Sequence, residues 1–438
     1  MSILFENVLG LFEAPAGGFT VRNTNIYIVG NEIAGIDRAP ADFSPERRID
    51  GAGKLLIPGL INSHTHVPMT ILRNAADDLK FHEWLFGRIL PLEEKLFPED
   101  CYWGTQLGLM EMLRTGTTCF LDMYFHIDHI AQAISDAGAR AVLSRGLMGG
   151  AEDPSGGERR LREAEDEVFR WRGHENLSFM LAPHAPYTCD PGYQREVAQT
   201  AKQLGLGIHT HIAESVREVE EIVTTYGKRP AALLEESGLL TNKTVAAHCV
   251  HLDGADIERL ARCGVHVAHN PVSNLKLANG IAPVPKLLAA GVNVALGTDG
   301  AASNNTLNLF RDLNFATLLH KGVSGNPEVV PAAQGLEMVW ANGALALGLG
   351  NVGKLAEGFL ADLVLIDLSH PNLQPSNDPI TALAYAASGH EVALTMVGGK
   401  ILYENGTYPT IDAARVYEEV EKICGRIGLR GVPASATS

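Results

Sequence analysis

Two histidines one residue apart close an apolar stretch, Ile57-Pro58-Gly59-Leu60-Ile61-Asn62-Ser63-His64-Thr65-His66. In an extended strand this spacing directs the imidazoles of His64 and His66 to the same face. Two ligands for one metal ion would then point the same way. A bare His-x-His pair is more often two packed or surface histidines, so the metal hypothesis depends on what the rest of the chain supplies.

Two later apolar stretches supply further ligands, because His211 closes residues 206–211 and Asp299 closes residues 292–299. A catalytic zinc ion takes three or four histidine and carboxylate ligands and keeps a position for water. With three neutral imidazoles and one carboxylate the ion retains positive charge, so it acidifies that water. The sequence therefore predicts one divalent ion held by His64, His66, His211 and Asp299. This ligand set favours zinc, with iron and manganese as alternatives.

Each of these assignments has an alternative. Asp299 taken alone would serve equally well as a helix N-cap in Gly297-Thr298-Asp299-Gly300. His209 competes with His211 because both lie on one strand face, and His211 is preferred because it lies nearer the strand end. A two-metal site would need a bridging ligand such as lysine where the sequence has His184, which favours a single ion.

Two further residues are candidates for proton transfer. Glu214 follows His211 by three residues, where the chain leaves the strand, and a general acid and base should lie beside the metal without being consumed as a ligand. Its alternative is a solvated glutamate in the acidic run of residues 214–221. His248 closes residues 244–248 and could orient the water or a developing oxyanion, or could be a packed core histidine.

Strand-like and helical segments alternate from residue 55 onward, which predicts a (β/α)₈ barrel with its reactive groups at the carboxyl ends of the strands. The helical segments include residues 98–114, 158–171, 193–204 and 216–234. The predicted strands span residues 55–66, 117–124, 140–147, 177–184, 206–211, 244–248, 265–270 and 292–299.

The two ends of the chain have short strand-like segments separated by glycine and proline, including residues 21–29, 32–36, 358–367 and 394–403. We expect residues 1–56 and 352–438 to form one composite β-sandwich domain beside a barrel of residues 57–351. A hairpin turns at Gly398-Gly399, residues 411–427 form a closing amphipathic helix, and residues 430–438 form a mobile tail.

Composition limits the class of protein. A chain of 438 residues with 46% hydrophobic residues can bury a large core and is too long for one small domain. No apolar run reaches 18 residues and no leader pattern opens the chain, so we expect a cytoplasmic protein with no membrane partner. A net charge of −16 disfavours nucleic acid, which leaves a small-molecule substrate. The six cysteines lack CxxC spacing and are expected to be reduced packing residues. Large barrels often form homo-oligomers, but no segment here identifies an interface.

Five motifs together carry a family resemblance: residues 58–66, Pro183-His184-Ala185-Pro186-Tyr187, His209-Thr210-His211-Ile212-Ala213-Glu214, Ala247-His248-Cys249 and residues 297–305. They resemble the amidohydrolase superfamily and, within it, the 5′-methylthioadenosine/S-adenosylhomocysteine deaminase branch. The resemblance implies attack of an activated water on C6 of an adenine ring and loss of ammonia. His64, His66, His211 and Asp299 match the family's metal ligands. Glu214 matches the glutamate that shuttles protons to purine N1, and His248 matches the histidine beside the attacking water.

The resemblance also implies substrate contacts. Glu93 resembles a glutamate that accepts the ribose hydroxyls, with Glu94 as its rival. His184 resembles a histidine that contacts the nucleoside, and Ser303 lies where a small polar residue faces the base.

A carboxylate-bearing substrate such as S-adenosylhomocysteine would also want a guanidinium, for which Arg145, Arg159 and Arg160 are candidates. We name Arg145, because residues 149–158 are expected to be a flexible loop that obscures the alignment of the other two. 5′-Methylthioadenosine is therefore the first expected substrate, with S-adenosylhomocysteine and adenosine as others. The alternatives are a guanine deaminase, a triazine chlorohydrolase-like enzyme and a barrel without catalysis, the last of which the complete ligand set argues against.

Overall fold

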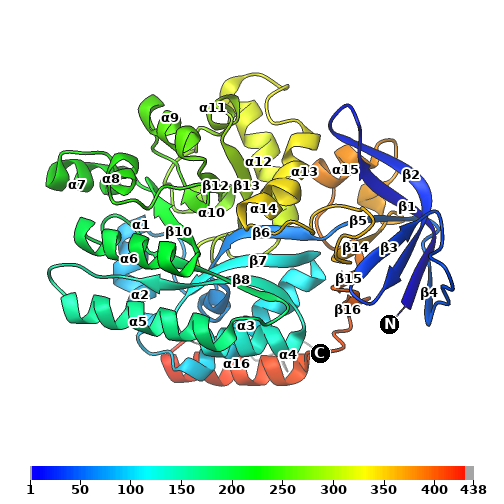
Figure 1. Cartoon of the computed structure of the whole chain (residues 1–438), viewed down its shortest axis with the longest axis horizontal. Helices are drawn as coiled ribbons and strands as arrows, with labels where there is room; N and C mark the ends of the chain where they lie inside the picture. Colours follow the sequence, from blue (N-terminus) through cyan, green and yellow to red (C-terminus); the bar gives the residue numbers. More distant parts are fainter. Residues whose placement is uncertain (1, 430–438) are drawn as a thin grey trace.

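The computed structural model describes residues 2–429 and contains two sheets (Figure 1). An eight-stranded parallel sheet forms a barrel with helices around it. A second, mixed sheet is built from both ends of the chain and lies at one side of the barrel. The predicted (β/α)₈ barrel with a small composite β-sandwich domain is confirmed. The predicted tail, residues 430–438, lies outside the described residues.

The barrel strands are almost wholly buried, because helices cover the outside of the barrel and side chains fill its inside. The strands are β6 (Leu60–Thr65), β7 (Thr117–Tyr124), β8 (Arg140–Leu147), β9 (Leu177–Pro183), β10 (Gly207–Ile212), β11 (Thr244–His248), β12 (His266–His269) and β13 (Asn293–Leu296). Three predicted strands coincide with β7, β8 and β11. The predictions for β9, β10, β12 and β13 differ from the observed strands only at their ends.

The first predicted strand, residues 55–66, was wrong as a single element. Its first half is β5 (Lys54–Pro58), which pairs with strands of the terminal sheet, and its second half is β6 of the barrel. Gly59 lies between them where a Cβ atom would overlap the Thr118 side chain. Both halves are buried, so one continuous apolar run conceals a change of sheet. The terminal sheet therefore reaches Pro58, beyond the boundary that we predicted at residue 56.

Hydrogen bonds of both side chains and backbone join the segment after the last barrel strand to the first strand. The Asn62 side chain accepts from the Thr298 N–H at 3.0 Å and donates to Thr298 Oγ1 at 2.8 Å, and the Asp299 N–H donates to the His64 carbonyl at 3.0 Å. A Cβ atom on Gly297 would come within 2.8 Å of the His64 backbone, so this close approach requires glycine. Barrel closure thus fixes His64 and Asp299 relative to each other.

The helices around the barrel begin with a short series after β6: the 3₁₀ turn η1 (Val67–Leu72), α1 (Phe81–Trp84), the π-helical turn η2 (Leu85–Ile89) and α2 (Leu90–Glu93). The others are α3 (Pro98–Arg114), α4 (Ile127–Ala137), α5 (Pro154–Trp171), α6 (Pro191–Leu204), α7 (Val216–Tyr226), α8 (Pro230–Glu236), α9 (Gly254–Cys263), α10 (Pro271–Lys276), α11 (Val284–Ala289), α12 (Leu309–Ser324), α13 (Ala332–Val339) and α14 (Ala341–Ala346).

Two helix predictions need correction. The predicted helix of residues 216–234 is two helices, α7 and α8, because Gly227 ends the first in a left-handed conformation. The expected loop of residues 149–158 is partly helical, because α5 already begins at Pro154. Asp153 caps α5, and its side chain accepts from the Gly156 N–H at 3.1 Å.

The terminal sheet has the order β16-β15-β14-β5-β1-β2-β3, with β4 beside β1. Its two halves share one apolar core, to which Ile3 and Ile26 contribute from one end of the chain and Leu363 and Met396 from the other. The turn at Gly398-Gly399 is confirmed. The elements are β1 (Ser2–Glu13), β2 (Phe19–Val29), β3 (Glu32–Ile36), β4 (Arg47–Asp50), β5, β14 (Leu363–Asp367), η3 (Pro371–Leu373), α15 (Pro379–Tyr385), β15 (Val392–Val397) and β16 (Lys400–Glu404).

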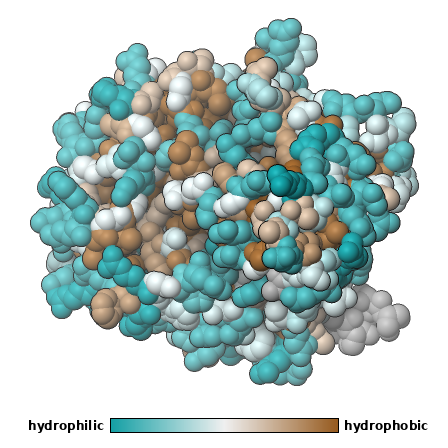
Figure 2. All heavy atoms as spheres, turned by 45° about the vertical axis from the view of Figure 1, so that its right-hand side comes forward, coloured by the Kyte–Doolittle hydropathy of each residue, from teal (hydrophilic) through white to brown (hydrophobic). Residues whose placement is uncertain are grey.

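The closing helix α16 (Ala413–Ile427) packs against α3 of the barrel (Figure 1). On the face shown in Figure 2, hydrophilic residues predominate and hydrophobic ones gather in smaller groups. Within residues 2–429, no helix has the length and apolar character needed to cross a bilayer.

Candidate metal centre and active site

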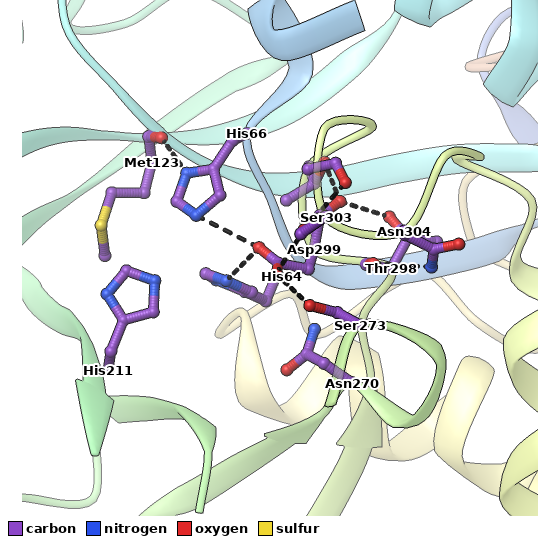
Figure 3. Close-up of polar contacts among 12 residues, drawn as sticks. His64, His66, Met123, His211, Asn270, Ser273, Thr298, Asp299, Ser303 and Asn304 are labelled. Carbon is purple, nitrogen blue, oxygen red and sulfur yellow. Dashed lines mark hydrogen bonds and ion pairs between the residues drawn. The ribbon is translucent and has the colours of Figure 1, made fainter. Parts of the chain in front are cut away.

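The predicted metal ligands converge at the carboxyl ends of three barrel strands (Figure 3). His64 lies on β6 with His66 just after it, His211 lies on β10, and Asp299 follows β13. The Nε2 atoms of His64 and His66 each lie 3.3 Å from Asp299 Oδ1. The His211 ring lies 5.0 Å from the His64 ring, centroid to centroid. Two overlapping groups of possible ligands, His64–His66–Asp299 and His64–His211–His248, share His64.

Backbone carbonyls fix the tautomers of two of these histidines. His66 Nδ1 lies 2.6 Å from the Met123 carbonyl oxygen, and His211 Nδ1 lies 2.7 Å from the His184 carbonyl oxygen. A carbonyl can only accept, so each Nδ1 carries the proton. When these rings are neutral, each Nε2 presents a lone pair to the centre. This arrangement is typical of histidines that bind metal through Nε2.

A hydrogen-bond chain fixes His64 in the same way. The Ser144 hydroxyl donates to the Asp122 carbonyl at 2.7 Å, so toward His209 Nδ1, 2.9 Å away, it must accept. His209 Nε2 is then an acceptor for His64 Nδ1–H at 2.7 Å. His64 Nε2, which is buried without a hydrogen bond, therefore carries a free lone pair. Burial also lowers the pKa of His64 to about 3, which keeps the ring neutral.

This series of hydrogen bonds shows which of the two rival histidines, His209 or His211, faces the predicted metal centre. His209 lies behind His64 and bonds to it, whereas His211 faces the centre. The residues present therefore fit a divalent ion: the buried, unbonded His64 nitrogen is shared by two overlapping groups, which add the oriented nitrogens of His66 and His211 and the Asp299 carboxylate.

Asp299 is held by two hydroxyl groups. Its Oδ2 accepts from Ser273 and from Ser303, each at 2.6 Å, which leaves Oδ1 directed at the histidines (Figure 3). Burial alone would raise the pKa of Asp299, but the close approach of the His64 and His66 rings outweighs it and holds this pKa well below its usual range. The expectation that Ser303 faces the base needs correction, because its hydroxyl turns back to the Asp299 carboxylate and Ser303 does not line the pocket.

Glu214 and His248 lie beside the predicted metal ligands. Glu214 is 5% exposed, its Oε1 accepts from Asn279 Nδ2 at 2.9 Å, and His248 Nε2 lies 3.9 Å from the same oxygen. Burial, and then the charge of Asp299, raise the pKa of Glu214 well above its usual range. His248 Nδ1 bonds to Asn274 Oδ1 at 2.8 Å, so its Nε2 faces the site. Glu214 is thus favoured in its protonated form, as an acid requires.

One pocket is lined by His66, His211 and Asp299 of the metal-type centre and by two of the predicted nucleoside contacts, Glu93 and His184. Glu93 lines it and accepts from the Tyr124 hydroxyl at 2.6 Å, while burial raises the pKa of Glu93 to about 7. Its rival Glu94 is exposed. His184 lines the same pocket, and burial lowers its pKa to about 4, so it is neutral. The remaining lining is largely apolar: Met69, Phe81, Trp84, Leu85, Leu90, Met123, Phe125 and Met148.

Arg145 was wrongly expected to bind substrate. It does not line the pocket, and its guanidinium pairs with Glu163 and, at 2.7 Å, with Glu167 on α5. Side chains alternate along β8, so that Ser144 points into the barrel toward His209 and Arg145 points outward. None of the described residues that line the pocket is a lysine or an arginine. Arg160 lies in an adjoining cavity, where it bonds to Asp153 and to the Met148 carbonyl.

Sequence reasoning missed several residues of the site. Three of them lie in or just after α10. Asn279 bonds to Glu214, Ser273 bonds to Asp299, and Asn274 bonds to His248. Tyr124 at the end of β7 holds Glu93. The only available signal was the position of Tyr124 at a strand end, since the direction of the other side chains depends on loop conformation.

The fold and this cluster define the class of protein: a (β/α)₈ barrel with a buried histidine and carboxylate centre suited to a divalent metal. The chain belongs to the amidohydrolase family, whose model matches residues 55–402.

Curated relatives and solved structures agree with this membership. The chain is 48% identical over 386 residues, 87% of this chain and 90% of the other, to the 5-methylthioadenosine/S-adenosylhomocysteine deaminase of Moorella thermoacetica. It is similar in structure to a zinc-bound adenosine deaminase from Xanthomonas campestris, with a TM-score of 0.92 and 35% identity over 97% of this chain and 98% of the other. It is also similar to a zinc complex of atrazine chlorohydrolase from Arthrobacter aurescens, with a TM-score of 0.89 and 26% identity over 96% and 99%.

Proposed function

We propose that the chain is a zinc-dependent hydrolase that removes the 6-amino group of an adenosine-type nucleoside, with 5′-methylthioadenosine as its first substrate. The products are the inosine analogue and ammonia. The observation that carries the proposal is that the buried Glu214 lines one pocket with His66, His211 and Asp299, while His64 lies directly beside them. The names of the deaminase relatives and the zinc in the solved neighbours support it.

His64, His66, His211 and Asp299 hold the ion in this proposal. When bound, the ion lowers the pKa of a coordinated water toward neutrality and so supplies the nucleophile. Glu214 gives its proton to N1 of the purine, which makes C6 electrophilic. Asp299 accepts a proton from the attacking water and returns it to the leaving amine. His248 Nε2, which lies 3.9 Å from Glu214 Oε1, orients the water.

The rest of the pocket supports a nucleoside with a short apolar 5′ group. Glu93, which lines the same pocket as Glu214, accepts the ribose hydroxyls, and neutral His184 accepts a further hydrogen bond. The apolar lining suits a methylthio group. A carboxylate would find no guanidinium among the described lining residues, since Arg145 is engaged with Glu163 and Glu167. We therefore rank 5′-methylthioadenosine above S-adenosylhomocysteine.

The test is the change in absorbance of the adenine band when zinc-loaded protein is mixed with 5′-methylthioadenosine, adenosine or S-adenosylhomocysteine. The proposal expects rapid change with 5′-methylthioadenosine and its loss after treatment with a chelator. Guanine and a chlorotriazine serve as comparison substrates. Turnover of either of them without turnover of any adenosine compound would refute the proposal.

A further inference from the structure

Glu218 lies on the first turn of α7, four residues after Glu214, and is 2% exposed. Its carboxylate does not reach the pocket that contains the metal-type centre. Instead, Oε1 accepts from the Ala213 N–H and Oε2 accepts from the Glu214 N–H, both at 2.8 Å. Both oxygens of a buried carboxylate are thus used to hold two successive peptide groups at the end of β10.

This arrangement differs from an ordinary helix cap. Ser215 is the N-cap of α7, and its hydroxyl accepts from the Glu218 N–H at 3.2 Å. In a capping box the glutamate at this position would return the bond to the N–H of Ser215. Glu218 passes over Ser215 and bonds to the two residues before it. Capping alone therefore does not explain where the carboxylate lies.

The peptide groups that Glu218 holds are otherwise in a costly conformation. Ala213 has a φ of +50°, in the left-handed region that non-glycine residues rarely adopt. Two successive N–H groups next to such a residue form a concave anion-binding turn, which the Glu218 carboxylate fills. On the opposite side, the Ala213 carbonyl accepts from the N–H groups of Val250 and His251 at 3.1 and 2.9 Å. The bend before Glu214 is fixed from both sides.

The side chain of Glu214 is held at one oxygen only. Asn279 donates to Oε1 at 2.9 Å, which leaves Oε2 as the atom available to carry a proton into the pocket. With the backbone held by Glu218 and Oε1 held by Asn279, Glu214 has little freedom to turn away. We infer that Glu218 is a positioning residue for proton transfer by Glu214, acting through the two backbone N–H groups that it accepts.

This inference rests on the proposed deamination, and Glu218→Gln tests it. Glutamine has the same shape but only one acceptor oxygen, so either the Ala213 or the Glu214 N–H would face an NH₂ donor. We expect kcat for 5′-methylthioadenosine to fall 10- to 100-fold, as is typical for residues that orient a reactive group. KM is expected to stay within about twofold and zinc content to be unchanged, because no binding atom has moved.

Asp100→Asn is the matched control. Asp100 is a buried carboxylate at the same position of α3, where it accepts from the Phe97 N–H at 2.6 Å and pairs with Arg426, and it does not line the pocket. Its loss should lower the melting temperature and leave kcat and KM unchanged. A Glu218→Gln variant that behaves in the same way, less stable but with full kcat, would reduce Glu218 to a helix cap and overturn the inference. A rise in KM at constant kcat would also overturn it.

A second measurement needs no substrate. Amide hydrogen exchange at Ala213 and Glu214 should accelerate at least tenfold in Glu218→Gln and stay unchanged in Asp100→Asn. This separates the two proposals: if the wild-type protein deaminates nothing, the proposed function fails while the exchange rates still show whether Glu218 holds the bend. Unchanged exchange would refute the inference in either case. If Glu218→Gln does not fold, Asn279→Ala loosens Glu214 from the other side and should lower kcat without lowering zinc content.

Discussion

Replacing Glu214 with glutamine removes an acid and keeps nearly all of the contacts. The amide oxygen can still accept from Asn279 Nδ2, now 2.9 Å from Glu214 Oε1, which places the NH₂ group where Oε2 faces the pocket. That NH₂ group can donate a hydrogen bond to purine N1 but cannot transfer a proton. Binding should therefore survive while catalysis does not.

The expected loss is that of one general acid, about 10²- to 10⁴-fold in kcat. This corresponds to about 2.7 to 5.4 kcal/mol of transition-state stabilisation. KM should change little, and zinc content should stay the same, because the four proposed ligands are untouched. Glu220→Gln on the exposed side of α7 is the control and should behave as wild type.

The pH profile gives an independent check of the same role. Burial, and next the charge of Asp299, raise the pKa of Glu214, so its protonated form persists above the usual range of a carboxyl group. Activity that needs this proton should be lost as pH rises through the raised pKa, and the glutamine variant should lack this limb. Absorbance assays across pH, with metal analysis of each variant, provide the data. Full activity in Glu214→Gln would remove Glu214 from the mechanism.

Two further substitutions address the surroundings of the centre. In His209→Leu, His64 Nδ1 loses its acceptor, and zinc affinity measured by competition with a chromogenic chelator should fall about 10- to 100-fold; unchanged affinity would contradict the role of His209. In Arg145→Met, Glu167 loses its partner in a nearly buried position, which should lower the free energy of unfolding in urea by about 3 to 5 kcal/mol. KM should stay the same for every substrate, and a rise confined to S-adenosylhomocysteine would restore Arg145 as a substrate ligand.

The elements of the site could be predicted because the fold brings strand ends together. Once alternating strands and helices indicate a barrel, residues that close its strands must share one rim, which is why His64, His211 and Asp299 could be grouped without a structure. The choice between His209 and His211 needed the direction of each ring. That direction depends on Ser144, two strands away in the barrel, and no sequence pattern reveals the contact.

The side of a strand on which a residue falls explains the error at Arg145. Arg145 was named as a candidate to bind a substrate carboxylate, but its neighbour Ser144 occupies the inward direction, so Arg145 contacts α5. Ser303 was misplaced for another reason. It lies in a turn closed by the Gly300 carbonyl, which accepts from the Ser303 N–H at 3.1 Å, and this turn brings its hydroxyl back to Asp299.

The backbone at three strand ends is strained, which could not be predicted from the sequence. Ala213, His248 and Asp299 have φ values of +50°, +70° and +62°, each a conformation that costs a non-glycine residue of order 1–3 kcal/mol. Each lies where a strand ends and a side chain must turn toward the centre, and each is held by a bond from elsewhere. Glu218 accepts from Ala213, Asn270 accepts from the His248 N–H at 3.3 Å, and the His64 carbonyl accepts from the Asp299 N–H.

Glycine would adopt these conformations at lower cost, but at residues 248 and 299 it would remove the functional side chain. The strain is therefore tied to the chemistry at those two positions. At Ala213 the strain is not tied to the chemistry, because its methyl side chain takes no part in the proposed reaction. There the surrounding bonds alone impose the bend, with Glu218 on one side and Val250 and His251 on the other. The orientation of Glu214, the proposed proton-transfer residue, thus depends on contacts from α7 and from the segment after β11.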